Sequence, residues 1–325
     1  MTRIVLYFFL ILLHTLFMSG QQLRTITIDA ETARPLNLSE IAEKVTPVIL
    51  ETPTTVVNGN IFMTSEYLFI TSLSTVVQYD LTGKFIRTID CGGYIDFNVT
   101  VDTLKKELYV AVKNKIKCYD YSGNLKKEYP YKNSSLYILY DKGQIWSLTY
   151  NKKSEKEVTQ SISKINLSTG ETILIFSFES TDYGNGCITR YNGNPVCSFE
   201  YDNKLYLVRQ NNAPPIVQWN INPPPQAKKD RVTLRTNGFA GDYLFINYRR
   251  GDQFYTYLEN MKTGEKYNTN IVVDDVFNTK TNCRLYSLNQ NGYFFFVKDL
   301  SDINGNHIGN IPLKKGPVIF IVKTK

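Results

Sequence analysis

A short phrase of aliphatic and aromatic residues recurs six times after the first sixty residues of this 325-residue chain. The copies begin at Leu68, Leu108, Ile145, Leu205, Leu244 and Leu285, so they are separated by 40, 37, 60, 39 and 41 residues. Four of these intervals match the roughly 40 residues that one four-stranded propeller blade needs. The repeat therefore predicts an all-β fold, a six-bladed β-propeller, in which the six phrases occupy equivalent places in successive blades.

A second phrase follows the first and ends in a polar turn. It pairs an acid or amide with a glycine a few residues later, at Asp80 and Gly83, Asp120 and Gly123, Asn166 and Gly170, and Asn260 and Gly264. The Asp or Asn side chain can cap the turn, and the glycine can adopt a positive φ. We therefore expect a hairpin at each of these four places. The fourth repeat runs instead into Pro223, Pro224 and Pro225, which predicts a loop.

The interval from 145 to 205 holds about twenty more residues than one blade needs. Part of it, residues 180–186, is rich in glycine and polar residues, which is typical of an enlarged loop. Because loops on a rigid scaffold often carry binding residues, this segment is our preferred position for a binding mouth. An insertion without a ligand is the alternative.

A closed ring needs its two ends joined. Residues 45–51 and 317–322 both have the composition of strands, so we expect one of them to complete a blade that the other end begins. Only residues 37–43 have the pattern of a short helix.

The first twenty residues have the layout of a secretory signal. Arg3 precedes an apolar run over residues 4–17, which is shorter than the roughly 18 residues of a spanning helix, and small residues follow at Ser19 and Gly20. We therefore expect residues 1–20 to be a signal peptide and residues 21–325 a single propeller domain without a membrane span. An uncleaved anchor is the alternative, because Met18 fits the cleavage pattern poorly.

The charge and the histidine count exclude several classes of function. The formal net charge is +7, but the lysines are scattered through turns, whereas a nucleic-acid site gathers them on one stripe. After the signal the chain has one histidine, His307, and no G-x-S-x-G motif. Histidine-dependent triads would therefore depend on this residue, and histidine-rich metal sites are excluded.

The five cysteines are Cys91, Cys118, Cys187, Cys197 and Cys283, and no C-x-x-C pair occurs among them. Cys187 and Cys197 flank a turn at residues 192–195, so a hairpin there would bring them nearly opposite one another. An exported protein could oxidise such a pair. A disulfide between them and two reduced, half-buried thiols are both consistent with the sequence.

The oxygen-rich residues 302–306 suggest calcium, but they do not form an EF-hand. With Gly305 at the sixth loop position, Leu300 and Ile311 fall where oxygen ligands are required. A propeller could hold calcium in its channel through carboxylates from several blades, with Asp274, Asp275 or Asp96 as candidates. Solvated turn carboxylates are the simpler interpretation, so no cofactor is assigned.

These phrases resemble those of a family of exported bacterial six-bladed β-propellers related to the NHL-repeat propellers. The matching pieces are residues 36–41, 47–52, 79–89, 119–125 and 317–323. The resemblance covers nearly the whole chain after the signal and is best in the opening segment and the first two blades. Residues 91–94 depart from it, since the family has a longer glycine-rich loop there. The resemblance implies a fold and a location in the periplasm or at the cell surface, and it implies no reaction.

The leading hypothesis for function is a monomeric, non-catalytic module that binds a protein or a glycan at the cell envelope. Candidate residues for an anionic or sugar ligand are Tyr183, Arg190, Arg249 and Arg250, and salt-bridged surface arginines are the alternative. The competing hypothesis is a hydrolase or lyase that uses carboxylates, with calcium in the channel. An enzyme predicts an acidic cluster at one mouth of the channel, and a binding module predicts a face lined by aromatic or arginine side chains.

Overall fold

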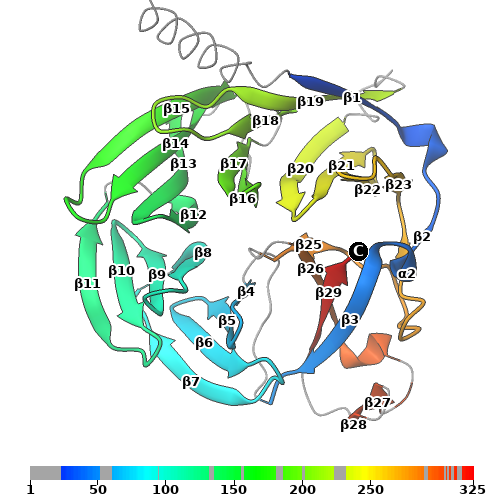
Figure 1. The fold of residues 1–325 in the computed structure, drawn as a ribbon, viewed down its shortest axis with the longest axis horizontal. Helices are drawn as coiled ribbons and strands as arrows, with labels where there is room; N and C mark the ends of the chain where they lie inside the picture. Colours follow the sequence, from blue (N-terminus) through cyan, green and yellow to red (C-terminus); the bar gives the residue numbers. More distant parts are fainter. Residues whose placement is uncertain are drawn as a thin grey trace, which may run out of the picture.

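The computed structural model describes residues 23–51, 61–93, 95–131, 135–154, 157–180, 186–199, 202–222, 232–288, 292–303, 305, 307–308, 311–312 and 317–325. The described chain forms six sheets of four or five strands arranged in a ring, each with one edge strand toward the centre and the other edge strand on the outside (Figure 1). This confirms the predicted six-bladed β-propeller.

Each of the first three blades is a four-stranded antiparallel meander. The first blade contains β4 (Ile61–Met63), β5 (Tyr67–Ser72), β6 (Thr75–Asp80) and β7 (Phe85–Asp90). The second blade contains β8 (Ile95–Asp102), β9 (Glu107–Val112), β10 (Lys115–Asp120) and β11 (Leu125–Pro130). The third blade contains β12 (Ser135–Asp141), β13 (Gln144–Ser154), β14 (Glu157–Asn166) and β15 (Thr172–Ser180).

The fifth blade is a meander of the same kind, whereas the fourth and sixth blades each include a strand from the N-terminal segment at the outer edge. The fourth contains β16 (Cys187–Tyr191), β17 (Asn194–Ser198), β18 (Lys204–Leu207), β19 (Pro215–Asn222) and, parallel to β19, β1 (Arg24–Asp29). The fifth contains β20 (Val232–Ala240), β21 (Tyr243–Arg250), β22 (Gln253–Asn260) and β23 (Lys266–Thr269). The sixth contains β25 (Tyr286–Ser287), β26 (Tyr293–Lys298), β29 (Val318–Thr324) and β3 (Ala42–Ile49).

The N-terminal segment closes the ring. Strand β3 is the outermost strand of the sixth blade and pairs with β29 from Val318 opposite Ile49 to Thr324 opposite Ala42. The predicted joining of the two ends is therefore present. Between β1 and β3 the chain forms a 3-10 turn (η1, Ala30–Thr32), the short β2 (Leu36–Asn37) and α2 (Leu38–Ile41).

Smaller elements complete the described chain. Strand β2 pairs in parallel with β24 (Val272–Val273), which follows the fifth blade. The segment between β26 and β29 contains η3 (Leu300–Asp302), β27 (His307–Ile308) and β28 (Ile311–Pro312). Helix α2 is shorter than the predicted 37–43 and begins after Asn37, whose backbone N–H donates to Glu40 Oε1 at 3.0 Å.

The described core consists of six apolar clusters, one at each junction between neighbouring blades. Alternation along a strand explains this arrangement, because successive side chains point to opposite faces of the sheet. In β5, Leu68 and Ile70 pack toward the sixth blade while Phe69 packs toward the second. The strands are apolar on both faces for this reason, and the aromatic content fills the wedges between blades.

The four predicted polar turns join the third and fourth strands of their blades. Asp80 Oδ1 accepts from the N–H of Thr82 at 2.8 Å and of Lys84 at 3.0 Å, and Gly83 has φ +91°. Asn260 Oδ1 likewise accepts from the N–H of Lys262 at 3.0 Å. The proline loop at 223–225 lies outside the described residues.

The predicted equivalence of the six phrases is wrong at two places. The strands at 68, 108, 145 and 244 are second strands, but the strand at 205 is the third of its blade and Leu285 precedes β25, the first of its blade. The second strands begin at 67, 107, 144, 194, 243 and 293, at intervals of 40, 37, 50, 49 and 50 residues. Several strands of one blade are buried on both faces, so an apolar phrase does not reveal its position within the blade.

Candidate functional site

Three polar side chains form a row across the fifth blade. Asn247 of β21 lies opposite Thr256 of β22, and Thr256 lies opposite Thr269 of β23. Thr256 Oγ1 donates to Asn247 Oδ1 at 2.8 Å, and Thr269 Oγ1 donates to the carbonyl oxygen of Ile271 at 2.6 Å. The row lies on the face of the sheet that packs against the sixth blade.

An arginine and a phenylalanine form the next row, at the end of the same hairpin. Arg249 pairs with Phe254 across the strands, and its guanidinium carbon lies 5.5 Å from the centroid of the Phe254 ring. Arg249 Nη2 also donates to Asp252 Oδ1 at 2.6 Å. Phe254 is 45% exposed, so an apolar ring faces solvent beside a cation.

A second arginine approaches this ring from the segment that precedes β25. The guanidinium carbon of Arg284 lies 5.2 Å from the Phe254 centroid and 5.4 Å from the Tyr286 centroid. The preceding residues are fixed by two hydrogen bonds: the N–H of Cys283 donates to the carbonyl oxygen of Val272 at 2.9 Å, and the N–H of Val272 donates to the side-chain Oδ1 of Asn282 at 2.7 Å. Arg284 therefore extends from an anchored segment.

Together these side chains enclose a cavity of about 230 Å³, which we call the interblade cavity. Its lining residues are Asn247, Phe254, Tyr255, Thr256, Thr269, Asn270, Val272, Asn282, Cys283 and Arg284. Burial raises the pKa of the Cys283 thiol to about 11, so it is protonated at neutral pH. The lining is thus suited to hold a ligand through hydrogen bonds, ring contact and positive charge.

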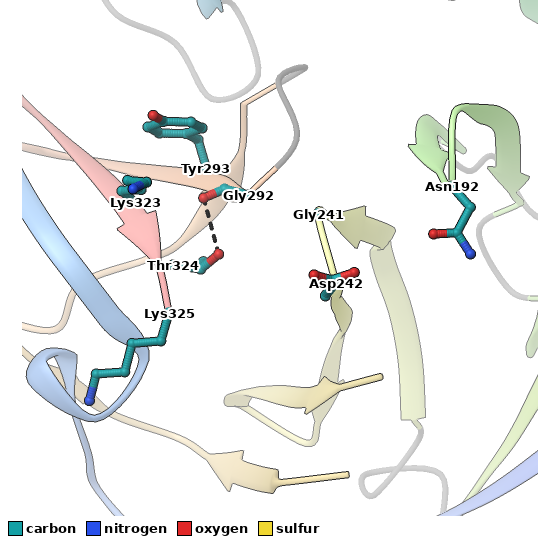
Figure 2. Close-up of a pocket in the computed structure, with 8 residues that line it drawn as sticks. All are labelled: Asn192, Gly241, Asp242, Gly292, Tyr293, Lys323, Thr324 and Lys325. Atoms are coloured by element: carbon teal, nitrogen blue, oxygen red, sulfur yellow. Dashed lines mark hydrogen bonds between the residues drawn. The ribbon is translucent and has the colours of Figure 1, made fainter. Parts of the chain in front are cut away.

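A second cavity, of about 280 Å³, lies among the innermost turns of the ring, and we call it the inner-turn cavity (Figure 2). Three blades contribute to it through the turns between their first and second strands, at Asn192, Gly241 and Gly292. The end of β29 contributes Thr324, whose Oγ1 donates to the carbonyl oxygen of Gly292 at 3.1 Å, together with Lys325.

Two charged residues of the inner-turn cavity are already paired with neighbours outside its lining. Asp242 Oδ2 lies 2.7 Å from Lys262 Nζ, and Lys323 Nζ lies 2.6 Å from Glu43 Oε2. The remaining charged side chain of its lining is Lys325, whereas Arg284 of the interblade cavity is held over the rings of Phe254 and Tyr286. The interblade cavity is therefore the stronger candidate site.

Arg190 lines neither of the two cavities and is paired with residues of a neighbouring blade. Its Nη1 donates to Asp141 Oδ1 at 2.7 Å, and its Nη2 donates to the carbonyl oxygen of Tyr140. Arg190 belongs to the fourth blade, and both partners belong to the third. The contact is an ion pair that joins two blades.

Arg249 and Arg250 are adjacent in β21 and therefore lie on opposite faces of the fifth blade. Arg249 is at the edge of the interblade cavity, whereas Arg250 is on the side of the fourth blade. The structure thus separates this predicted pair. Tyr183 and most of the predicted loop at 180–186 lie outside the described residues.

Cys187 and Cys197 are both buried, and both are free thiols in the structure. Cys187 lies opposite Ser198, and Cys197 lies opposite Ile188, so the two cysteines are one residue out of register. Adjacent register positions point to opposite faces of a sheet. Cys197 packs toward the third blade together with Ile188, and Cys187 points the other way.

The candidate calcium ligands are engaged by the protein itself. Asp274 accepts from the N–H of Phe277 at 2.9 Å and from Thr279 Oγ1 at 2.8 Å. Asp275 accepts from the N–H of Ser39 at 2.9 Å, beside α2 on the outer side of the ring (Figure 1). Burial opposes ionisation of Asp275, but the Ser39 hydrogen bonds outweigh it and hold its pKa below the usual value.

The described residues contain no group of three or more His, Cys, Asp or Glu side chains arranged to hold a metal ion. The side chain of Asp96 lies outside the described part of the chain, and His307 is exposed. No helix within the described ranges is long and apolar enough to cross a bilayer.

Sequence reasoning missed Phe254 and Arg284, which define the interblade cavity. The available signal was the position of Phe254 just after the turn that follows Arg249 and Arg250, which places an aromatic residue opposite an arginine in a hairpin. Arg284 gave no signal, because the phrase that it precedes was assigned to the wrong strand of the blade.

The profile of a family described as a domain of unknown function, DUF4934, matches residues 23–320. No curated protein matches the chain. Among solved structures, a predicted exported protein of Bacteroides fragilis NCTC 9343 is similar, with a TM-score of 0.68 and 14% identity, over 93% of this chain and 99% of that one. A protein of unknown function from Bacteroides thetaiotaomicron VPI-5482 has a TM-score of 0.50 and 11% identity, over 87% and 77% of the two chains. These similarities show the fold alone.

Proposed function

Because this chain belongs to the DUF4934 family, whose function is unknown, we propose a function from its own geometry: it is an exported propeller that binds a glycan or a protein at the cell envelope without chemical turnover. The observation that carries this proposal is the interblade cavity. An exposed aromatic ring, a guanidinium and a row of amide and hydroxyl side chains line it. Such groups hold and orient a ligand.

The same lining argues for binding over catalysis. A general acid or base at neutral pH needs a pKa near that pH, and the described lining residues include no carboxylate or imidazole. The thiol of Cys283 has a pKa of about 11. Two of the carboxylates that were candidates for the channel calcium of the competing hypothesis, Asp274 and Asp275, are hydrogen-bonded elsewhere in the fold.

The proposed location is supported by the N-terminal sequence pattern and by the similar Bacteroides fragilis protein, which is described as exported. Fractionation of cells that express the full chain tests it. The protein is expected in the periplasmic or surface fraction, with a mature N-terminus at Gln21. Recovery of an intact N-terminus in the cytoplasmic fraction would contradict export.

Binding is tested with immobilised mature chain and four probes: solubilised peptidoglycan, a neutral polysaccharide, an acidic polysaccharide and solubilised envelope proteins. At least one probe is expected to bind, and Phe254→Ala is expected to weaken that binding. Leu104→Ala is the matched control, because Leu104 is a 96% exposed apolar residue of the second blade. The proposal fails if no probe binds, if Phe254→Ala binds like wild type, or if a polysaccharide probe gains reducing ends.

A further inference from the structure

The two arginines beside Phe254 differ in how their charge is satisfied. Arg249 is paired with Asp252, whose side chain is 97% exposed. Arg284 is exposed and forms no ion pair with any residue that the structure describes. Its contacts are with the rings of Phe254 and Tyr286, which attract a cation without neutralising it. Arg284 therefore keeps a full positive charge at the cavity.

The guanidinium of Arg284 is also held in place before any ligand arrives. The ring contacts restrict the side chain, and the Asn282 and Cys283 contacts fix the backbone beside it. A preorganised planar fork favours a planar oxyanion that accepts two parallel hydrogen bonds, which is the geometry of a carboxylate. Preorganisation also lowers the entropy that binding must overcome.

The remaining lining selects what carries that carboxylate. Phe254 offers an apolar face, and the side chain of Asn270 forms no hydrogen bond with other described residues, so it can accept from and donate to hydroxyl groups. The volume of about 230 Å³ is smaller than the roughly 300 Å³ at which sites for drug-sized molecules start. It suits one sugar ring and its substituents rather than a long apolar group.

We propose that the interblade cavity binds a uronic acid unit of a glycan, with the carboxylate on Arg284, one face of the sugar ring on Phe254 and sugar hydroxyls at Asn270. This assignment rests on the proposed binding function and names the ligand class of its site. Binding is non-covalent, and the affinity is expected to fall as salt screens the exposed guanidinium.

Calorimetric titration of the mature chain with glucuronic acid, its methyl ester and glucose tests the assignment. Glucuronic acid is expected to bind about tenfold more tightly than the ester and glucose, because a charge-assisted bidentate pair is lost in both. Arg284→Gln is expected to abolish this preference, and Arg284→Lys to retain only part of it. Raising NaCl from about 0.05 M to about 0.5 M is expected to weaken the binding of glucuronic acid but not of glucose.

Arg34→Gln is the matched control, because Arg34 also lies over a ring, 5.9 Å from the Tyr267 centroid, but is paired with Glu40 at 3.0 Å outside the cavity. It is expected to bind like wild type. If Arg284→Gln does not fold, the assignment is tested by the salt dependence and by Asn270→Ala. Glucuronic acid binding that neither added salt nor Asn270→Ala weakens overturns the assignment.

Equal affinity for glucuronic acid and glucose overturns the uronic acid assignment while leaving a glycan-binding function intact. Tighter binding of an oligoglutamate peptide than of glucuronic acid overturns it in favour of an acidic protein segment. Absence of binding to all of these probes and to the envelope probes overturns both this assignment and the proposed function.

Discussion

The side-chain ammonium of Lys298 donates hydrogen bonds to both the carbonyl oxygen and the hydroxyl of Thr281. Its Nζ lies 3.0 Å from the Thr281 carbonyl oxygen and 2.9 Å from Thr281 Oγ1, and the carbonyl oxygens of Lys280 and Asn282 lie 2.8 Å and 3.1 Å away. Lys298 is 2% exposed. Thr281 has φ +66°, which a β-branched residue adopts only when its surroundings impose it. The buried Lys298 thus holds the turn at residues 280–282, which leads to Arg284.

Lys298→Met is therefore expected to lower both stability and ligand affinity. The substitution keeps a long apolar side chain but removes the charged donor from the carbonyl oxygens of Lys280, Thr281 and Asn282. A hydrogen bond to a charged group contributes about 1.5–3 kcal/mol. Urea unfolding measures the first effect and titration with the ligand of the interblade cavity the second. Lys323→Met is the control, because Lys323 is half-exposed in its pair with Glu43. Equal, small effects of the two substitutions would show that the Lys298 hydrogen bonds do not hold the turn.

Gly83→Ala is expected to weaken the closure of the ring. Gly83 has φ +91°, and a Cβ there would lie 2.2 Å from the carbonyl oxygen of Ile49, in the strand that completes the sixth blade. Gly170→Ala is the control: it lies in the turn between the same two strands of the third blade, one residue longer, with φ +76° and nothing within 4 Å of an added Cβ. The control pays only the positive-φ strain of about 1–2 kcal/mol. Thermal unfolding should rank the two, and equal losses would contradict the steric argument.

The sequence could predict the blade count and the closure because both depend on periodic signals. The apolar phrases mark strands buried on two faces, and the Asp or Asn before Gly marks hairpins in which one side chain caps the turn, as Asp80 does for Thr82 and Lys84. The same signals do not fix a strand's position within its blade, so Leu205 and Leu285 were assigned to the wrong strands.

The candidate site was harder to predict from the sequence, because it depends on contacts across a blade junction. Arg284 and Phe254 are thirty residues apart in sequence and meet only when the fifth and sixth blades pack together. Arg190 was predicted as a candidate ligand residue, but it forms an ion pair within the fold. Nothing in its sequence neighbourhood revealed that Asp141, in another blade, lies 2.7 Å from it.

The Arg190–Asp141 pair is expected to contribute to stability and not to ligand binding. The two side chains are 26% and 15% exposed, so the pair is screened less than a surface pair and joins the third blade to the fourth. A double-mutant cycle with Arg190→Gln and Asp141→Asn should give a coupling energy of about 1 kcal/mol or more in urea unfolding. If Arg190→Gln folds but no longer binds the ligand, and the cycle gives no coupling energy with Asp141, Arg190 would be a ligand-binding residue.

All five cysteines are expected to be reduced and unreactive in the native protein. Each is buried and free, and the register of β16 and β17 turns Cys187 and Cys197 to opposite faces. Alkylation without reductant should modify no thiol in the native state and five after unfolding, as read by intact mass. Only three adducts after unfolding, with two further ones after reduction, would show a disulfide.

These thiols also predict a loss of stability in mild alkali. Burial raises the pKa of Cys91, Cys118 and Cys283 to about 11 and that of Cys187 to about 12, whereas an unfolded thiol has a pKa of about 8.5. The folded state therefore keeps protons that the unfolded state releases, so the free energy of unfolding falls as the pH rises above about 8.5. Each thiol contributes at most about 1.4 kcal/mol per pH unit. Urea midpoints between pH 7.5 and 9.0 measure the fall below the pKa of about 10 of unfolded tyrosines, and a Cys187→Ala, Cys283→Ala variant should show a shallower fall. An identical slope in that variant would assign the effect to other groups.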